Sequence, residues 1–247
     1  MNKIENHKKN WEALGESDPF WAVLSDNSKR FNNWDVDEFI KTGEAEVENV
    51  FSQMKSLGIG ISRGEILDFG CGVGRLARHW LKYFDKYNGT DISEAMIKKA
   101  QDINKGWEVE FFVNNDSLEI FDDNKFDFIY SGIVLQHLPD KDFIKKYILE
   151  FKRILKPGGG LVFQLPSKIP WTFRLQPVRR LYNFLSKIGF SEKFLYQQLG
   201  LYPIKMSFIL ENDMRKFLED NDFKVLSIKG DTYCGPRVES RTYYCQK

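Results

Sequence analysis

The strongest chemical signal in the sequence is a glycine-rich turn that follows a short apolar segment. Residues 65–69 (EILDF) predict a buried strand, and Gly70, Gly72 and Gly74 come directly after it. Glycine permits the positive φ angles of a tight turn and lets a ligand approach the backbone closely. We expect a helix at residues 75–84, whose free N–H groups and positive dipole end would point at the same place. The turn therefore predicts a ligand site.

Acidic residues end the next two predicted strands. Asp91 closes the strand at 86–91, where a carboxylate can accept hydrogen bonds from both hydroxyls of a ribose. Asp116 follows the strand at 107–113, where it can accept from an exocyclic amine such as that of adenine. Each acid also fits a local role, Asp91 beside the helix cap Ser93 and Asp116 within a loop turn. Their shared position at strand ends favours a nucleoside ligand.

Two cofactors fit these features. Residues 72–77 (GVGRLA) match the G-x-G-x-x-A fingerprint of dinucleotide folds, which favours a nicotinamide cofactor. The one Tyr-x-x-x-Lys pair, Tyr243 and Lys247, lies at the C-terminal end of the sequence and not near a predicted catalytic strand end. Asp68, immediately before the glycines, would repel a pyrophosphate and suits a ligand that carries an amino group.

Five segments occur in order with ordinary spacing: DFGCGVG, GTDIS, NNDS, FDFIYSGIVLQHLPD and LKPGGGLVFQLP. Together they resemble the motif series of class I S-adenosylmethionine-dependent methyltransferases, closely over residues 60–166 and loosely over 207–247. The resemblance implies a transferase that uses S-adenosyl-L-methionine. It also implies a seven-stranded sheet whose last strand is antiparallel.

The same resemblance implies which residues hold the cofactor. Three at the glycine turn would line the methionine and ribose, and Asp91 would take the ribose hydroxyls. The side chain that follows Asp91 would pack on adenine, two residues after the third strand would meet the adenine edge, and a serine after the fourth strand would approach the methionine portion. In chain order these residues are Gly70, Cys71, Gly72, Asp91, Ile92, Asp116, Ser117 and Ser131.

Strands alternate with helices from residue 65 to residue 166, which predicts βαβ units and a parallel sheet with helices on both faces. Right-handed crossovers make this an α/β, doubly wound, Rossmann-like fold. Strands near residues 223–229 and 241–246 are expected to pair as a hairpin. We divide the chain into an N-terminal helical cap (1–60), a cofactor-binding domain (61–166 and 207–247) and an inserted lid (167–206).

His137 is the candidate catalytic base. It follows the fourth predicted strand, in LQHLPD, where the loop opens at the carboxyl edge of the sheet. Methyl transfer is a displacement in which the protein aligns the reactants and, for a hydroxyl acceptor, removes a proton. An ordinary histidine pKa of about 6.5 suits that work. The alternative is that His137 only packs against the next turn.

The inserted lid is basic and aromatic. Residues 167–206 hold seven Lys and Arg side chains against one acid, Glu192, and eight aromatic residues. Such a lid favours an anionic acceptor, bound through arginines such as Arg174, Arg179 and Arg180. The alternatives are a solvated basic face over an aromatic underside, an RNA or N-methylation substrate, and attachment to a membrane surface. O-methylation of a small anionic or sugar-like molecule is the favoured function.

Composition excludes several classes of protein. The 247 residues carry 36 Lys and Arg against 35 Asp and Glu, so a uniformly basic nucleic-acid-binding surface is not expected. Three cysteines without metal-type spacing predict neither a disulfide framework nor a metal site, and they favour the cytoplasm. No apolar run approaches the ~20 residues of a membrane span. A silent cofactor-binding regulatory protein remains the non-enzymatic alternative.

Two weaker expectations concern the N-terminal segment. Residues 11–26 (WEALGESDPFWAVLSD) and the stretch from Phe31 resemble a leader of bacterial methyltransferases, including some near surface-polysaccharide genes. The resemblance favours a role in surface-polysaccharide or secondary-metabolite biosynthesis. In the same segment, Arg30 is a candidate partner for the methionine carboxylate.

Overall fold

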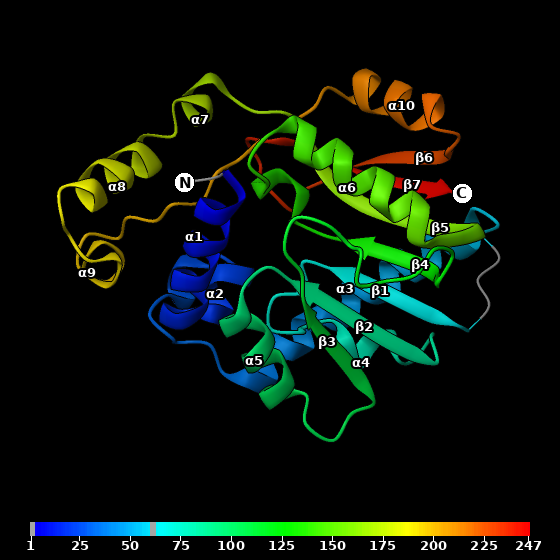
Figure 1. Cartoon of the computed structure of the whole chain (residues 1–247), viewed down its shortest axis with the longest axis horizontal. Coiled ribbons are helices and arrows are strands. Elements are labelled where there is room, and N and C mark those ends of the chain that lie inside the picture. Colours follow the sequence, from blue (N-terminus) through cyan, green and yellow to red (C-terminus); the bar gives the residue numbers. More distant parts are fainter. Residues whose placement is uncertain (1–2, 60–62) are drawn as a thin grey trace.

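The computed structural model describes residues 3–59 and 63–247. In this part of the chain, seven strands form one mixed sheet in the order β3-β2-β1-β4-β5-β7-β6 (Figure 1). β7 runs antiparallel to both β5 and β6, whereas the other neighbours pair in parallel. The predicted Rossmann-like fold with an antiparallel last strand is confirmed. The strands are β1 (Glu65–Phe69), β2 (Lys86–Asp91), β3 (Val109–Val113), β4 (Phe126–Ser131), β5 (Leu155–Lys168), β6 (Lys224–Asp231) and β7 (Glu239–Gln246).

Helices cover both faces of the sheet. Successive side chains of a strand point to opposite faces, so neighbours in β1 enter different cores. Leu67 joins the core under α6 and α10, and Ile66 joins the core under α3 and α4. α5 packs on β3 and on α1. These five helices are α3 (Val36–Ser56), α4 (Ala77–Trp80), α5 (Glu94–Ile103), α6 (Lys141–Ile154) and α10 (Glu211–Asp220).

The helix after the glycine turn is shorter than the sequence predicts. α4 spans Ala77–Trp80, not residues 75–84, and residues 71–76 form turns. The three glycines of the turn have φ angles of +75°, +54° and +72°, which a helical hydrogen-bond ladder does not accommodate. A four-residue helix carries little macrodipole. The expectation that a helix N-terminus points at the ligand is therefore wrong, and the backbone of the turn takes its place.

The N-terminal helices pack between the glycine turn and the inserted segment. α1 (Lys3–Ser17), α2 (Pro19–Val23) and the start of α3 share a buried core with Val73 of the turn, Met96 of α5 and Tyr196 of residues 167–206. The division of the chain into cap, cofactor-binding domain and lid stays a prediction. Its first boundary, at residues 60–61, lies outside the described residues.

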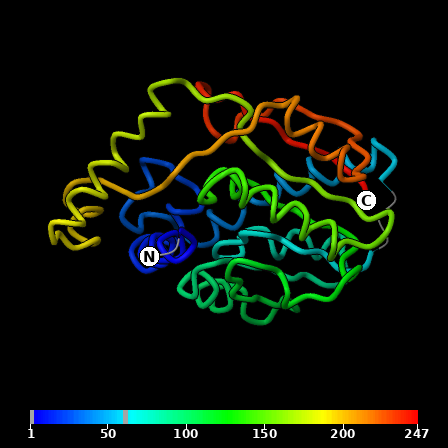
Figure 2. The backbone as a smooth tube through the Cα atoms, turned by 45° about the horizontal axis from the view of Figure 1, so that its top comes forward, coloured from blue at the N-terminus to red at the C-terminus, as the bar shows by residue number. Residues whose placement is uncertain are grey.

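Residues 167–206 form three short helices between β5 and α10. Figures 1 and 2 both show them at one margin of the molecule, beyond the edge of the sheet. Their inner side closes a small core of Tyr182, Leu195 and Leu201. The helices are α7 (Trp171–Leu175), α8 (Pro177–Lys187) and α9 (Glu192–Gln197).

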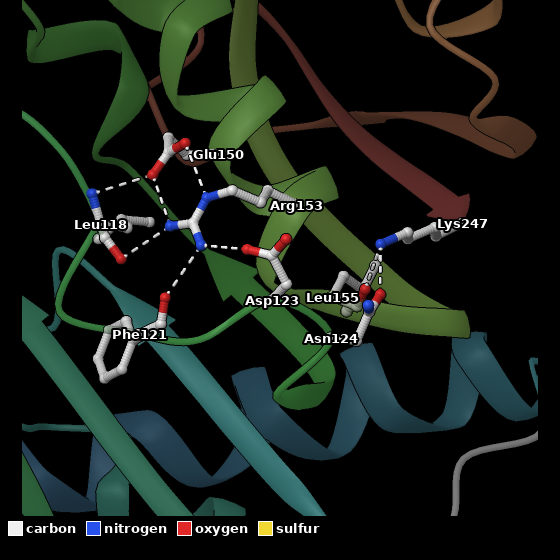
Figure 3. Close-up of polar contacts among 8 residues, drawn as sticks. All are labelled: Leu118, Phe121, Asp123, Asn124, Glu150, Arg153, Leu155 and Lys247. Carbon is white, nitrogen blue, oxygen red and sulfur yellow. Dashed lines mark hydrogen bonds and ion pairs between the residues drawn. The ribbon is translucent and has the colours of Figure 1, made fainter.

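An arginine fastens the loop after β3, which carries two of the predicted site residues. Arg153 of α6 forms a two-point ion pair with Glu150 at 2.8 and 3.0 Å (Figure 3). Its guanidinium also donates to the carbonyls of Leu118 and Phe121, each at 3.0 Å, and pairs with Asp123 at 2.7 Å. The loop is thereby held on α6 at several points.

Candidate functional site

The glycine turn lies against the end of β2. The N–H groups of Gly70 and Cys71 donate to the carbonyl of Thr90 at 2.7 and 2.9 Å. A Cβ on Gly70 would stand 2.3 Å from a methyl group of Val134, and a Cβ on Gly72 would stand 2.5 Å from one of Val23. Any larger residue would therefore collide with the loop after β4 or with the end of α2. The turn is a cradle whose shape depends on glycine.

Asp91 stands beside this cradle, as the sequence predicts. β1 and β2 are parallel neighbours, so their carboxyl ends meet at one edge of the sheet. The Asp91 carboxylate accepts from the N–H of Gly72 and from the N–H of Ser93, each at 3.0 Å. Burial raises its pKa to about 6, against the opposing effect of those two donors. The carboxylate therefore ionises close to neutral pH, and backbone donors fix its direction.

Asp68, the acid before the glycines, lies deeper than Asp91. Its side chain is buried and accepts from the hydroxyl of Tyr87 at 2.8 Å. Burial raises the pKa of Asp68 to about 7, and the negative charges of Glu46 and Asp91 add to that shift. Asp68 thus exchanges a proton near neutral pH beneath the turn.

Ser131 provides the clearest sign that a ligand belongs at this edge. It ends β4, the other neighbour of β1, and is fully buried. Within the described residues its hydroxyl has no hydrogen-bond partner. Buried hydroxyls are nearly always paired, so an unpaired one beside a glycine cradle fits a bound ligand with polar groups. Contact of Ser131 with the methionine portion, which the resemblance implies, stays a prediction.

The other predicted cofactor residues occupy different depths. Cys71 is buried, and its thiol packs toward Gly89 of β2, so only its backbone can line the turn. Ile92 is half-buried directly after Asp91. Ser117 is half-buried in the loop that Arg153 fastens, whereas Asp116 is exposed and lies 3.6 Å from Lys146 of α6. Contact of Ile92, Asp116 and Ser117 with adenine stays a prediction.

A buried asparagine after β3 escaped the sequence analysis. The backbone N–H of Asn114 donates to the carbonyl of Asp91 at 3.0 Å and so joins the ends of β3 and β2. Its side-chain amide lies 3.4 Å from the hydroxyl of Tyr147. The motif NNDS includes Asn114, but the sequence-based prediction was placed on the acidic residue Asp116.

His137 lies on a short 3-10 turn, Leu135–His137, and both of its ring nitrogens have partners. Nδ1 donates to the carbonyl of Lys205 at 2.6 Å, so Nε2 is the unprotonated nitrogen and accepts from the side-chain amide of Gln136 at 3.1 Å. Burial lowers the pKa of His137 to about 4. The imidazole is therefore neutral at pH 7, with a defined tautomer.

A pocket of about 220 Å³ opens beside His137. α1 supplies one wall with His7 and Trp11, and the ring of Trp11 lies 5.4 Å from the imidazole of His137. Residues 167–206 supply the opposite wall with Arg179 and Lys205. Among the described residues that line the pocket there is no carboxylate. The pocket is therefore cationic, and burial lowers the pKa of His7 to about 3, so that this imidazole is neutral.

The three lid arginines named by the sequence analysis do not act together. Arg179 lines the pocket, with a half-buried side chain. Arg180, the next residue, is exposed on the outer side of α8. Arg174 is exposed, and its guanidinium lies over the ring of Phe208 at 4.9 Å. Lys205, which the sequence analysis did not single out, joins Arg179 in the pocket.

Arg30 has partners that the sequence did not predict. Its guanidinium lies among the rings of Trp21, Phe31, Tyr196 and Tyr202, at 4.5 to 5.9 Å from their centroids. It also donates to the carbonyl of Gly200 at 3.3 Å. Arg30 joins the N-terminal helices to residues 167–206 in this structure. Pairing of Arg30 with a methionine carboxylate stays a prediction.

A polar network supports the wall behind His137. The Gln136 side-chain oxygen accepts from the thiol of Cys234 at 2.8 Å. Gln164 of β5 donates to the hydroxyl of Ser240 and accepts from the N–H of Ile133 at 3.1 Å. No sequence pattern predicts these partners, because they come from β5, β7 and the connection between β6 and β7.

A buried ion pair secures the cap beneath the cradle. Arg75, which follows the glycine turn, lies 2.6 Å from Glu46 of α3, and both side chains are nearly inaccessible. The hydroxyl of Tyr130, in β4, donates to the second oxygen of Glu46 at 2.7 Å. Glu46 thus connects α3 to the carboxyl end of β4, at the residue directly before Ser131.

Comparison with known proteins agrees with this geometry. Residues 67–163 match the methyltransferase domain family. The chain is 34% identical over 153 residues to a ubiquinone/menaquinone biosynthesis C-methyltransferase of Laribacter hongkongensis, covering 56% of this chain and 61% of that protein. It is 32% identical over 137 residues to phosphoethanolamine N-methyltransferase 1 of Arabidopsis thaliana, covering 54% and 27% respectively. The chain thus spans less than two thirds of these curated relatives.

A solved structure extends the likeness to the whole fold. Magnesium protoporphyrin IX methyltransferase of Synechocystis, which was solved with bound S-adenosylhomocysteine, superposes with a TM-score of 0.63 at 20% identity, and both chains are fully covered. The domain match identifies residues 67–163 as a methyltransferase domain, and the superposition shows that the chain shares the fold of the Synechocystis protein. The nicotinamide alternative is thereby set aside. The relatives named above methylate nitrogen in one case and carbon in the other, so similarity does not fix the acceptor atom.

Proposed function

We propose that this protein transfers a methyl group from S-adenosylmethionine to a hydroxyl oxygen of a small acceptor that bears an anionic group. The observation that carries the proposal is the cationic pocket beside His137, a residue of the loop that follows β4. Arg179 and Lys205 suit a phosphate or carboxylate, since charge-assisted hydrogen bonds are the strongest of their kind. A sugar or sugar-like molecule with such a handle fits a pocket of this size. The cytoplasm stays the proposed location.

The cofactor residues position the donor. S-adenosylmethionine supplies an already activated methyl group on a sulfonium, so catalysis rests on alignment. The backbone of Gly70 to Gly72 gives room for close approach, and the Asp91 carboxylate is aimed to accept ribose hydroxyls. Ser131 offers its unpaired hydroxyl to the methionine portion. The position of these residues at the same sheet edge supports the proposed assignments.

His137 is proposed to take the acceptor's proton. A neutral imidazole can accept a proton at pH 7, and its Nε2 is the nitrogen that carries the lone pair. In this structure Nε2 of His137 accepts a hydrogen bond from the amide of Gln136. The acceptor hydroxyl would have to displace that hydrogen bond. The carbonyl of Lys205 would then stabilise the charged ring through Nδ1. His137 and Lys205 thus couple proton removal to the anion-binding wall.

The test is a turnover assay with a defined acceptor panel. Purified protein is incubated with S-adenosylmethionine and with matched pairs of small alcohols, one member of each bearing a phosphate or carboxylate. Formation of S-adenosylhomocysteine is measured, and the product is mapped by mass spectrometry. We expect turnover only with anionic members and methylation on oxygen. Methylation of nitrogen, preference for neutral members, or tight cofactor binding without turnover on any panel member would each contradict the proposal.

A further inference from the structure

The outer surface of residues 167–206 is unusually apolar. Among the described residues, thirteen large apolar side chains are exposed, and eight of them fall between residues 171 and 199. Trp171 is 71% exposed and Phe184 is 60% exposed. Isolated exposed apolar residues are ordinary, whereas a concentration of them marks an interaction surface. The eight are Trp171, Leu175, Leu181, Phe184, Ile188, Phe190, Phe194 and Leu199.

α8 is apolar on two sides, and only one of them is covered. Its inner side packs Tyr182 with Leu195 and Leu201. Its outer side presents Leu181 and Phe184, three residues apart and both exposed. This spacing places the two side chains on one helical stripe. No element of the described chain covers that stripe, and Figures 1 and 2 show α8 and α9 at the outer margin.

Cations surround the outer stripe without acidic partners. Arg180, Lys187 and Lys193 are all exposed, and within the described residues none of them forms an ion pair. The one acid of the segment, Glu192, is half-buried and lies 3.1 Å from Lys9 of α1. The outer surface of α7 to α9 therefore combines exposed aromatic and aliphatic side chains with uncompensated positive charge.

We propose that the outer face of α7 to α9 docks on a lipid bilayer that carries anionic headgroups. Large apolar side chains insert at the boundary between headgroups and acyl chains, and lysines and arginines are attracted to the anionic surface. Charge complementarity decides this partner. A second copy of the chain would bring the same cations against each other, with no acid to offset them. Aliphatic Leu181 and Ile188 offer nothing for stacking on nucleic-acid bases.

The docking is peripheral. Among the described residues, no helix is long and apolar enough to cross a membrane. α8 contributes to both the pocket and the docking surface. Arg179 lines the pocket, whereas Arg180 is exposed on the outer side. Membrane attachment therefore does not use the residues that line the pocket. The proposal stands whether or not the acceptor is the one proposed above.

The experiment measures binding of the full chain to vesicles. Sedimentation is compared for phosphatidylcholine vesicles and for vesicles in which about one third of the lipid is phosphatidylglycerol. We expect binding to the anionic vesicles that weakens with added salt. Each cation near the surface contributes about fivefold to partitioning, so the triple variant Arg180→Gln, Lys187→Gln, Lys193→Gln should bind roughly a hundredfold more weakly. Equal partitioning of wild type and triple variant would overturn the proposal.

Matched variants separate docking from folding. Leu181→Ser with Phe184→Ser should abolish sedimentation, whereas Leu149→Ser, an exposed apolar residue of α6, should leave it unchanged. Lys98→Gln, on exposed α5 surface, is the corresponding charge control. Thermal melting and S-adenosylhomocysteine binding report that each variant is folded. Light scattering gives the oligomeric state. A wild-type dimer that dissociates in the Leu181/Phe184 variant, without vesicle binding, would assign the surface to a second copy and overturn the proposal.

Discussion

The imidazole Nδ1 of His137 lies 2.6 Å from the carbonyl oxygen of Lys205. This bond joins the loop after β4 to the end of the inserted segment, 68 residues later in the chain. It fixes the tautomer of the candidate base and places Lys205 over the same pocket. The proposed base and the proposed anion-binding wall are therefore positioned by each other.

Substitution of Asp91 tests the cofactor cradle. Asp91→Ala removes a carboxylate positioned to make two charge-assisted hydrogen bonds to the ribose, each worth about 1.5–3 kcal/mol. We expect S-adenosylhomocysteine affinity to fall at least tenfold in titration calorimetry, with an unchanged circular dichroism spectrum. Unchanged affinity would remove Asp91 from the site. Asp116→Ala, in an exposed loop position, shows by comparison whether the adenine edge needs a carboxylate.

The pH dependence of cofactor binding tests the ionisation of the same group. Burial raises the pKa of Asp91 to about 6, so the carboxylate gains a proton as the pH falls through that value. Cofactor affinity should therefore decline from pH 7 to pH 5. Asp68 titrates at about 7 and contributes its own step. Calorimetry on Asp91→Asn separates the two contributions. In this variant the change of cofactor affinity near pH 6 should disappear, and the change near pH 7 should remain.

Substitution of His137 tests proton removal. His137→Ala should lower kcat by about 10²–10⁴ while cofactor affinity barely changes. Because burial lowers the pKa of His137 to about 4, the ring is already neutral at pH 5, and the acid limb of kcat should lie near pH 4 and not near 6.5. His79→Ala is the matched control, since His79 bonds to the carbonyl of Ile40 outside the pocket. A loss below tenfold would give His137 a structural role.

Neighbouring arginines of α8 test the anionic acceptor. Arg179→Ala should lower kcat/KM for an anionic acceptor by a factor that corresponds to about 2–4 kcal/mol of lost binding free energy. The change should appear in KM more than in kcat. Arg180→Ala removes the same charge from the outer side of the helix and should change kcat/KM less than twofold. Added salt should reduce the difference in kcat/KM between the Arg179→Ala and Arg180→Ala variants. If both variants lower kcat/KM equally, the acceptor responds to the total positive charge of residues 167–206 and not to a direct contact with Arg179.

The buried ion pair beneath the cradle should contribute to stability. Glu46→Gln leaves Arg75 buried without a compensating charge, which costs about 3–5 kcal/mol in comparable buried pairs. Urea unfolding of the free protein should show that loss as a lower midpoint. Glu44→Gln, two residues earlier on the solvent side of α3, breaks the exposed pair with Lys82 and should leave the midpoint unchanged.

Local sequence determined the class of this protein and the position of its cradle. Glycines at 70, 72 and 74 impose a turn after an apolar strand, and the parallel alternation that follows brings Asp91 and Ser131 to the same sheet edge. These relationships follow from the order of strands and helices in a doubly wound sheet, so residue order and spacing suffice to predict them. The shortened α4 was the exception, because glycines that make a good turn also prevent a helix from starting.

Tertiary structure alone decided the remaining contacts. The hydrogen bonds from His137 to Lys205, from Arg75 to Glu46 and from Arg30 to Gly200 span 29 to 170 residues of the chain, and spacing in the sequence carries no information at such separations. The division between Arg179 and Arg180 is likewise invisible in the sequence. It depends on α8 packing through Tyr182 against Leu195 and Leu201, because the two adjacent arginines face different surroundings only once that helix has docked.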